Sequence, residues 1–201
     1  FANDILQHGL CNCSLRTRTS LKTGVMDRFV IISGCSGGGK SALLSELRRR
    51  GYATVSEPGR GIVQEETAGH GTALPCLDME AFTKRAIEIA IRDRTETARM
   101  SGWVFFDRSL IDAATALEHV TNRSALPAIS RERYHSRVFI APPWPEIYVH
   151  DDGRRHGLEG AMAECDRLLN AFEFLGYDLC VLPNAGIAQR ADFILATLGA
   201  K

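Results

Sequence analysis

The stretch Phe29-Val30-Ile31-Ile32-Ser33-Gly34-Cys35-Ser36-Gly37-Gly38-Gly39-Lys40-Ser41 decides the fold of this 201-residue chain. It opens with a run of apolar, largely β-branched residues, which is typical of a buried strand. The pattern Gly-x-x-x-x-Gly-Lys-Ser follows at once, and Leu43, Leu44 and Leu47 then recur at helical spacing. A strand, a glycine-rich loop and a helix in this order predict a P-loop, which binds the phosphates of a nucleotide.

The residues of this loop have separate expected tasks. Glycines let the backbone curl until its N–H groups point at phosphate oxygens, and the helix adds its positive end. Lys40 is expected to reach the β- and γ-phosphates, and the Ser41 hydroxyl to bind Mg²⁺. We therefore predict that a Mg²⁺-bound nucleoside triphosphate, ATP with GTP as the alternative, is held by Gly34, Ser36, Gly37, Gly38, Gly39, Lys40 and Ser41.

Strand-like and helical segments alternate along the rest of the chain. The expected strands cover residues 28–33, 52–55, 103–106, 138–141 and 177–182, with helices between them. This alternation predicts an α/β fold in which a parallel sheet is covered by helices on both faces. The final helix is expected to be capped by Asn184.

Composition narrows the function classes. The 24 basic and 24 acidic residues balance, so the overall basic field typical of nucleic-acid binding is absent. No stretch approaches the ~20 apolar residues that cross a bilayer, so we expect no membrane partner. The 6 cysteines lack metal-ligand spacing and indicate free thiols in a reducing cytoplasm. The sequence does not indicate an oligomeric state.

Residues 1–25 differ from the rest of the chain. They carry little apolar periodicity and are expected to form a flexible N-terminal extension to a single domain over residues 26–201. Three origins stay open: an extension added by cloning or by the choice of start codon, a native tail, and an organellar presequence. Met26, directly before the first strand, favours the first of these.

A second acidic motif ends the predicted strand 103–106. Asp107 lies at the carboxyl edge of the sheet, where ligands of parallel sheets bind. It can hold Mg²⁺ or accept the proton of an attacking hydroxyl, and the sequence leaves both roles open. Arg108 can clamp an anionic group of an acceptor. Asp112 either lines the same cleft or stabilises the first helical turn.

Two further segments are candidates for the acceptor and for a lid. Glu57 and Arg60 flank a Pro-Gly turn after the second strand, where they can meet a sugar hydroxyl and an anionic group, or simply form a surface ion pair. Arg154 and Arg155 follow a Pro-rich turn and are expected to lie over the γ-phosphate or in a solvated loop. Trp144, in that turn, is expected to anchor the loop to the core, with stacking on a ligand as the alternative.

The order of these motifs resembles that of a family of small P-loop ATPases. The quoted residues are Phe29–Ser41, Glu57-x-x-Arg60, Phe106-Asp107-Arg108-Ser109-x-x-Asp112 and Asp152-x-x-Arg155. This family is similar to the ribosylnicotinamide kinase domain and, more distantly, to nucleoside and nucleotide kinases. The resemblance runs from Arg28 to Leu198. It implies a P-loop NTPase fold with a five-stranded parallel sheet in the order 2-3-1-4-5 and a lid between the last two strands.

The first expectation for function is a kinase that moves the γ-phosphoryl of ATP to a small, nucleoside-like acceptor. Its expected catalytic residues are Lys40, Asp107 and Arg155, with Mg²⁺ on Ser41 and Asp107. Arg154 is expected to help bind the nucleotide, and the acceptor is expected to meet Glu57, Arg60, Arg108 and Asp112. Two alternatives stay open: an NTPase switch that acts through a protein partner, and a phosphotransferase for an antibiotic or a cell-wall sugar.

Overall fold

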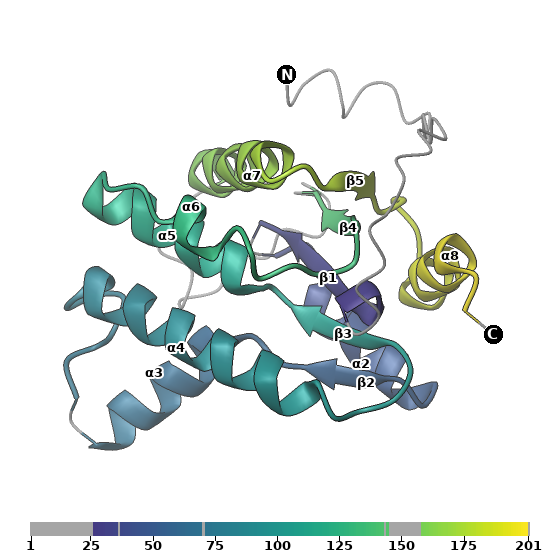
Figure 1. The fold of residues 1–201 in the computed structure, drawn as a ribbon, viewed down its shortest axis with the longest axis horizontal. Helices are drawn as coiled ribbons and strands as arrows, with labels where there is room; N and C mark the ends of the chain where they lie inside the picture. The colour runs from purple at the N-terminus through teal and green to yellow at the C-terminus, as the bar shows by residue number, and fades with distance from the viewer. Residues whose placement is uncertain (1–25, 36, 70, 143, 145–157, 201) are drawn as a thin grey trace.

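The computed structural model describes residues 26–35, 37–69, 71–142, 144 and 158–200 (Figure 1). The described strands are β1 (Phe29–Gly34), β2 (Ala53–Val55), β3 (Val104–Asp107), β4 (Arg137–Ala141) and β5 (Asp178–Val181). The helices are η1 (Met26–Arg28), α2 (Lys40–Arg49), α3 (Pro58–Gly69), α4 (Met79–Thr97), α5 (Leu110–Thr121), α6 (Leu126–Ile129), α7 (Leu158–Phe174) and α8 (Ile187–Leu198). The expectation of a flexible tail over residues 1–25 lies outside the described residues.

The described strands form one parallel sheet in the order β2-β3-β1-β4-β5. β1 lies at its centre, with Ile31 beside Phe106 of β3 and Ile32 beside Phe139 of β4. The P-loop therefore starts from the middle strand. This order confirms the expected P-loop fold with its 2-3-1-4-5 sheet.

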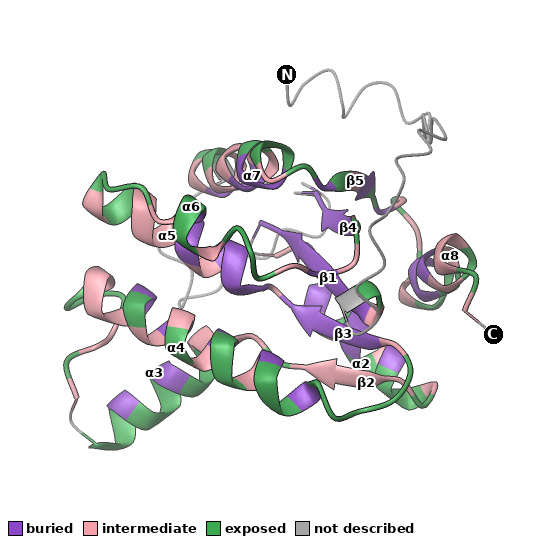
Figure 2. Cartoon of the chain, in the orientation of Figure 1, coloured by how far each residue is buried: buried purple, intermediate pink, exposed green. Residues whose placement is uncertain are grey.

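Alternate residues of the strands pack on opposite faces of the sheet, because side chains of a strand point up and down in turn. Phe29 and Ile31 belong to the core beneath α4, α5 and α7, whereas Val30 and Ile32 belong to the core beneath α2 and α8. Figure 2 shows β1 and β3 buried and β2 half-buried at the edge of the sheet. Within the described residues, no helix is both long and apolar enough to cross a membrane.

One helix start differs from the prediction. α8 begins at Ile187 with Gly186 as its N-cap, so the expectation that Asn184 caps this helix is wrong. The Gly186 N–H donates to the Gln189 side chain at 3.1 Å, which satisfies a backbone group at the helix start. Asn184 lies two residues before the N-cap position and therefore does not cap the helix.

Candidate active site

The P-loop connects β1 to α2, and its backbone includes glycines at positive φ, among them Gly34 and Gly39. Gly34 has φ +124°, and a side chain there would collide with the carbonyl of Ala141 in β4. Gly39 has φ +72° and is the N-cap of α2, which no described side chain caps. Because the first N–H groups of a helix have no partner within it, this helix start offers donors to an anion.

Lys40 lies inside the loop and is almost fully buried. Its Nζ donates to the carbonyl oxygens of Gly34 at 3.1 Å and Cys35 at 2.6 Å. Burial lowers the pKa of Lys40 and so does the nearby Arg108, while the charge of Asp107 opposes them. Loop carbonyl groups thus hold the ammonium group at the place where the motif predicts phosphate.

Ser41 and Asp107 meet beside this lysine. The Ser41 hydroxyl donates to Oδ2 of Asp107 at 2.9 Å, which joins the start of α2 to the end of β3. The other carboxylate oxygen, Oδ1, is buried and has no hydrogen-bond partner among the described residues. Burial raises the pKa of Asp107, and Lys40 acts against that rise.

This pair fits a magnesium ion. Mg²⁺ prefers oxygen ligands and is usually held by one or two protein oxygens together with substrate phosphates and water. A hydroxyl and a carboxylate with one free oxygen, next to a phosphate loop, supply that donor set. We call Lys40, Ser41 and Asp107 the phosphate end of the site.

Arg108 turns the chain at the end of β3. Its φ of +65° is uncommon for a residue other than glycine, while its N–H still donates to Ile32 of β1 at 3.0 Å. Consequently the side chains of two consecutive residues contact different parts of the site: Asp107 contacts Ser41, and Arg108 contacts carboxylates on other elements. A strained backbone of this kind is often found at functional sites.

Three carboxylates surround the Arg108 guanidinium. Its Nη1 lies 2.8 Å from Glu164 in α7 and 3.8 Å from Asp112 in α5, and its Nε lies 3.2 Å from Glu57 after β2. Burial acts to lower the pKa of Arg108, but Glu164, Glu57 and Asp112 outweigh burial and raise it. We call Glu57, Arg108, Asp112 and Glu164 the acceptor cluster.

Glu164 was missed by the sequence analysis. It lies in the middle of an amphipathic helix and belongs to no recognisable motif, so its sequence neighbours give no signal. Only the packing of α7 against β1 and α5 brings it to Arg108.

Asp112 closes the first turn of α5. It accepts from the Ser109 N–H at 2.8 Å and the Ser109 hydroxyl at 2.7 Å, and Ser33 also donates to it. Ser109 in turn caps the helix through the Ile111 N–H. This arrangement is the helix-stabilising one of the two interpretations of Asp112, with the added contact to Arg108.

Glu57 and Arg60 are less closely paired than their spacing suggested. Their charged groups are 3.9 Å apart, and the Arg60 side chain is 68% exposed. Glu57 lies nearer to Arg108 than to Arg60, and its side chain is 30% exposed. The structure therefore brings Glu57 into the acceptor cluster and leaves Arg60 at its rim.

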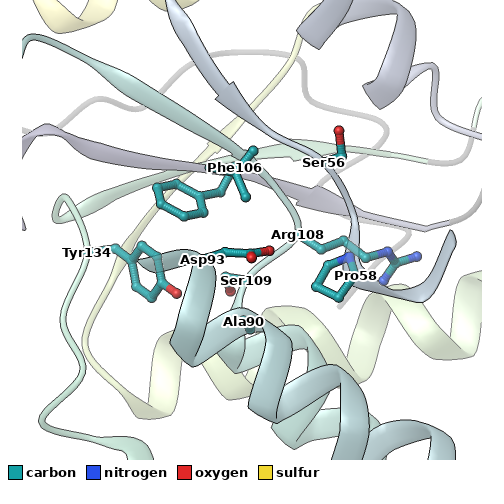
Figure 3. A pocket seen from close by; sticks show the side chains of 9 residues that line it. Ser56, Pro58, Ala90, Asp93, Phe106, Arg108, Ser109 and Tyr134 are labelled. Carbon is teal, nitrogen blue, oxygen red and sulfur yellow. The ribbon is translucent and has the colours of Figure 1, made fainter. Parts of the chain in front are cut away.

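A small pocket adjoins the acceptor cluster (Figure 3). Its volume of about 10 Å³ lies between α4 and the ends of β2 and β3. The rings of Phe106 and Tyr134, with centroids 5.4 Å apart, line one end, and Pro58 and Arg108 line the other. Asp93 lies between them, and burial raises the pKa of its carboxyl.

A sequence profile of the AAA domain family matches residues 29–190. The chain belongs to this family. A search of curated proteins gave no match. The resemblance expected from the order of the motifs is confirmed by this match and by the solved structures that share the fold.

Those solved structures are P-loop proteins at low identity. A deoxyadenosine kinase from M. mycoides, with products dCMP and a flexible dCDP bound, is 15% identical with a TM-score of 0.56 over 85% of this chain and 98% of its own. NadR in complex with NR is 19% identical with a TM-score of 0.63 over 88% of this chain and 53% of its own. NadR with NAD and AMP-PNP is 17% identical with a TM-score of 0.58 and corresponding coverages of 88% and 51%.

Some expected site residues of this AAA domain lie outside the described residues, namely Ser36, Arg154 and Arg155. Trp144, expected to anchor the segment before them, is 6% exposed and packs in the core with Val30 and Ile32.

Proposed function

We propose that this AAA domain is an ATP-dependent kinase that transfers the γ-phosphoryl group to a hydroxyl of a small, nucleoside-like acceptor. The observation that carries the proposal is the junction of Asp107 and Arg108. One residue belongs to the phosphate end and the next to the acceptor cluster, so a donor and an acceptor bound at these places would meet at the end of β3.

The phosphate end holds the triphosphate in this proposal. The loop N–H groups and the start of α2 bind the phosphate oxygens, and Lys40 leaves its loop carbonyls for the β- and γ-phosphates. Ser41 and Asp107 hold Mg²⁺, which when bound neutralises phosphate charge and orients the γ-phosphoryl group. Because Asp107 is already paired with Ser41, we assign it to the metal.

Glu57 is the candidate base for the acceptor hydroxyl. It is partly exposed and lies at the carboxyl end of β2, and Arg108 fixes its carboxylate at 3.2 Å. A carboxylate there can accept the hydroxyl hydrogen bond and then the proton. Glu164 shares Arg108 and is proposed to bind a second hydroxyl of the acceptor, Asp112 acts by orienting Arg108, and Arg60 meets the acceptor at the rim.

The pocket beside Arg108 has room for about one water molecule, so a planar ring of the acceptor would have to widen it. Phe106 and Tyr134 offer aromatic walls, and Asp93 offers an acceptor for a ring N–H. Two proteins with this fold support a nucleoside-like acceptor: a deoxyadenosine kinase crystallised with dCMP, and NadR crystallised with NR. Arg154 and Arg155 are proposed to neutralise charge at the γ-phosphoryl group, where arginines commonly act in phosphoryl transfer.

The test is ADP release with Mg²⁺–ATP, measured with and without a panel of nucleosides. Strong stimulation by one nucleoside, lost in Glu57→Gln, supports the kinase. The control is Glu159→Gln, an exposed glutamate of α7. Slow release that no acceptor changes would refute the kinase and favour a nucleotide switch.

A further inference from the structure

Arg190, in the first turn of α8, is a buried arginine that pairs with no acidic residue among the described ones. It is 5% exposed; its backbone N–H donates to Gly186, but its side chain forms no hydrogen bond or ion pair with any described residue. Its Nε is buried and unsatisfied. The guanidinium lies 3.8 Å from the ring centroid of Trp144, so its described contact is with an aromatic face.

The buried Arg94 and the partly buried Arg108 have partners that Arg190 lacks among the described residues. Arg94 donates to the Arg133 carbonyl at 2.5 Å and lies 3.2 Å from Glu132, and Arg108 has three carboxylates. A buried charge without a counter-charge is costly, and cation–π contact offsets only part of that cost. Arg190 therefore has the environment of a group whose anionic partner is a ligand.

The guanidinium points at the P-loop. A side-chain carbon placed on Gly39 would lie 3.2 Å from Nη1 of Arg190 and 3.9 Å from Ile187 of the same helix. Gly39 is the N-cap of α2 and directly precedes Lys40. Arg190 thus stands beside the start of the helix that receives the phosphates.

From this geometry we infer that Arg190 binds the phosphate chain of the nucleotide, at the α- and β-phosphates. The inference rests on nucleotide binding by the P-loop, which is part of the proposed function, but does not need phosphoryl transfer.

The position in the sheet selects these phosphates. Asp107 and Arg108 end β3, and Glu57 follows β2, so these residues lie on the β3 and β2 side of β1, whereas Arg190 follows β5 on the other side. The γ-phosphoryl group must face the acceptor, so the opposite side of the loop meets the rest of the phosphate chain. ATP and ADP share that part, and Arg190 is expected to contribute equally to both.

Trp144 acts as the positioning residue for Arg190. A guanidinium is planar and stacks on an aromatic face, which fixes its plane while leaving its N–H donors free at the edge. Trp144 follows β4 and is itself held in the core beneath α2 and α8. The ring can therefore hold the guanidinium toward Gly39.

The experiment is calorimetric titration of Arg190→Met and Arg190→Lys with Mg²⁺–ADP, a non-hydrolysable Mg²⁺–ATP analogue and tripolyphosphate, without any acceptor. Arg190→Met keeps an apolar side chain against Trp144. It should weaken the affinity for each of the three ligands by about tenfold or more, and the affinities for ADP and for the ATP analogue should fall by the same factor. Arg190→Lys keeps the positive charge and should lose less affinity than Arg190→Met. Melting temperatures establish that each variant is folded.

Arg133→Met is the matched control, because Arg133 also stacks on an aromatic ring, that of Tyr177 at 4.2 Å, but at the amino-terminal ends of β4 and β5, away from the P-loop. It should leave all three affinities unchanged. If folded Arg190→Met and Arg190→Lys bind all three ligands within twofold of the parent, Arg190 is structural and the inference is wrong. An effect on the nucleotides but not on tripolyphosphate would also overturn it. If no acceptor stimulates ADP release, only the kinase proposal is refuted, because this titration uses no acceptor.

Discussion

The residues of the phosphate end lie mostly close together in the sequence, whereas those of the acceptor cluster are spread over distant parts of the chain. Lys40 and Ser41 are neighbours in the first turn of α2, directly after the P-loop, and only Asp107 comes from elsewhere. The acceptor cluster takes its residues from the ends of β2 and β3 and from α5 and α7. Phosphate is a common ligand that a local backbone loop can bind, whereas an acceptor must be recognised by side chains that the whole fold assembles.

This contrast predicts that substitutions at the two places separate nucleotide effects from acceptor effects. Lys40→Ala should give the largest loss, about 10³-fold in turnover with weaker Mg²⁺–ATP binding, because it removes a charged donor from the phosphates. The described hydrogen bonds of Lys40 go to loop carbonyls, so the fold should survive. Titration with an ATP analogue and ADP-release kinetics measure the two effects.

Lys84→Ala is the matched control for that loss, because Lys84 is a surface lysine paired with Glu80 at 2.7 Å. It should leave both binding and turnover unchanged. Unaltered affinity and turnover in Lys40→Ala would remove the basis for a phosphate end.

Asp107→Asn tests the link between the two places. The variant keeps the shape and the contact to Ser41 but removes the charge that would hold Mg²⁺. Turnover should fall by about 10²-fold or more while the nucleotide still binds. Raising the Mg²⁺ concentration should recover part of the turnover, which is measured as ADP release at increasing Mg²⁺ concentrations. Asp192→Asn, at an exposed aspartate of α8, should behave like the parent; turnover of Asp107→Asn within a few-fold of the parent would make Asp107 structural.

The same contrast explains how much the sequence predicted. The P-loop was predictable because a buried strand, fixed glycines and a helix follow one another in the chain, and the sheet order was implied by the resemblance to small P-loop ATPases. Asp107 and Arg108 were predictable as residues at a strand end. Asp107 and Arg108 contact different parts of the site because Arg108 has a positive φ, and an arginine in the sequence gives no sign of that backbone conformation.

Glu164, Asp93 and Arg190 could not be found in the sequence. Each lies within a helix among ordinary amphipathic positions, and only tertiary packing brings it to Arg108, to the pocket or to Gly39. Asn184 was wrongly chosen as a helix cap because a cap-forming residue type close to a helix start is a weak signal of where the first turn begins.

Glu164→Gln sharpens the comparison on the acceptor side. Removing one carboxylate from a buried charge cluster typically costs on the order of 2–5 kcal/mol, so the KM for the acceptor should rise more than tenfold. The affinity for Mg²⁺–ATP should stay unchanged, because the described ion pair of Glu164 is with Arg108 and not with the phosphate end. Arg60→Ala should raise the KM less, since Arg60 lies exposed at the rim. Loss of ATP affinity with a normal response to the acceptor would assign Glu164 to the nucleotide instead.

The smallest effect is expected for Asp112→Asn, which distinguishes a helix cap from an acceptor contact. The asparagine keeps one oxygen for the Ser109 N–H but loses the charge near Arg108. Stability should fall by about 1 kcal/mol, the usual scale of an altered cap, and acceptor KM should rise only a few-fold, because Glu57 and Glu164 still hold Arg108.

Asp78→Asn is the comparison for Asp112→Asn, because Asp78 caps α4 by accepting from the Ala81 N–H at 2.9 Å and makes no described contact with Arg108. Both variants should lower the melting temperature, and only Asp112→Asn should change the KM for the acceptor. Equal KM values in the two variants would mean that Asp112 serves the helix alone. A rise in KM as large as that of Glu164→Gln would mean that Asp112 reaches the acceptor in spite of its burial, and the acceptor cluster would then have to open when the acceptor binds.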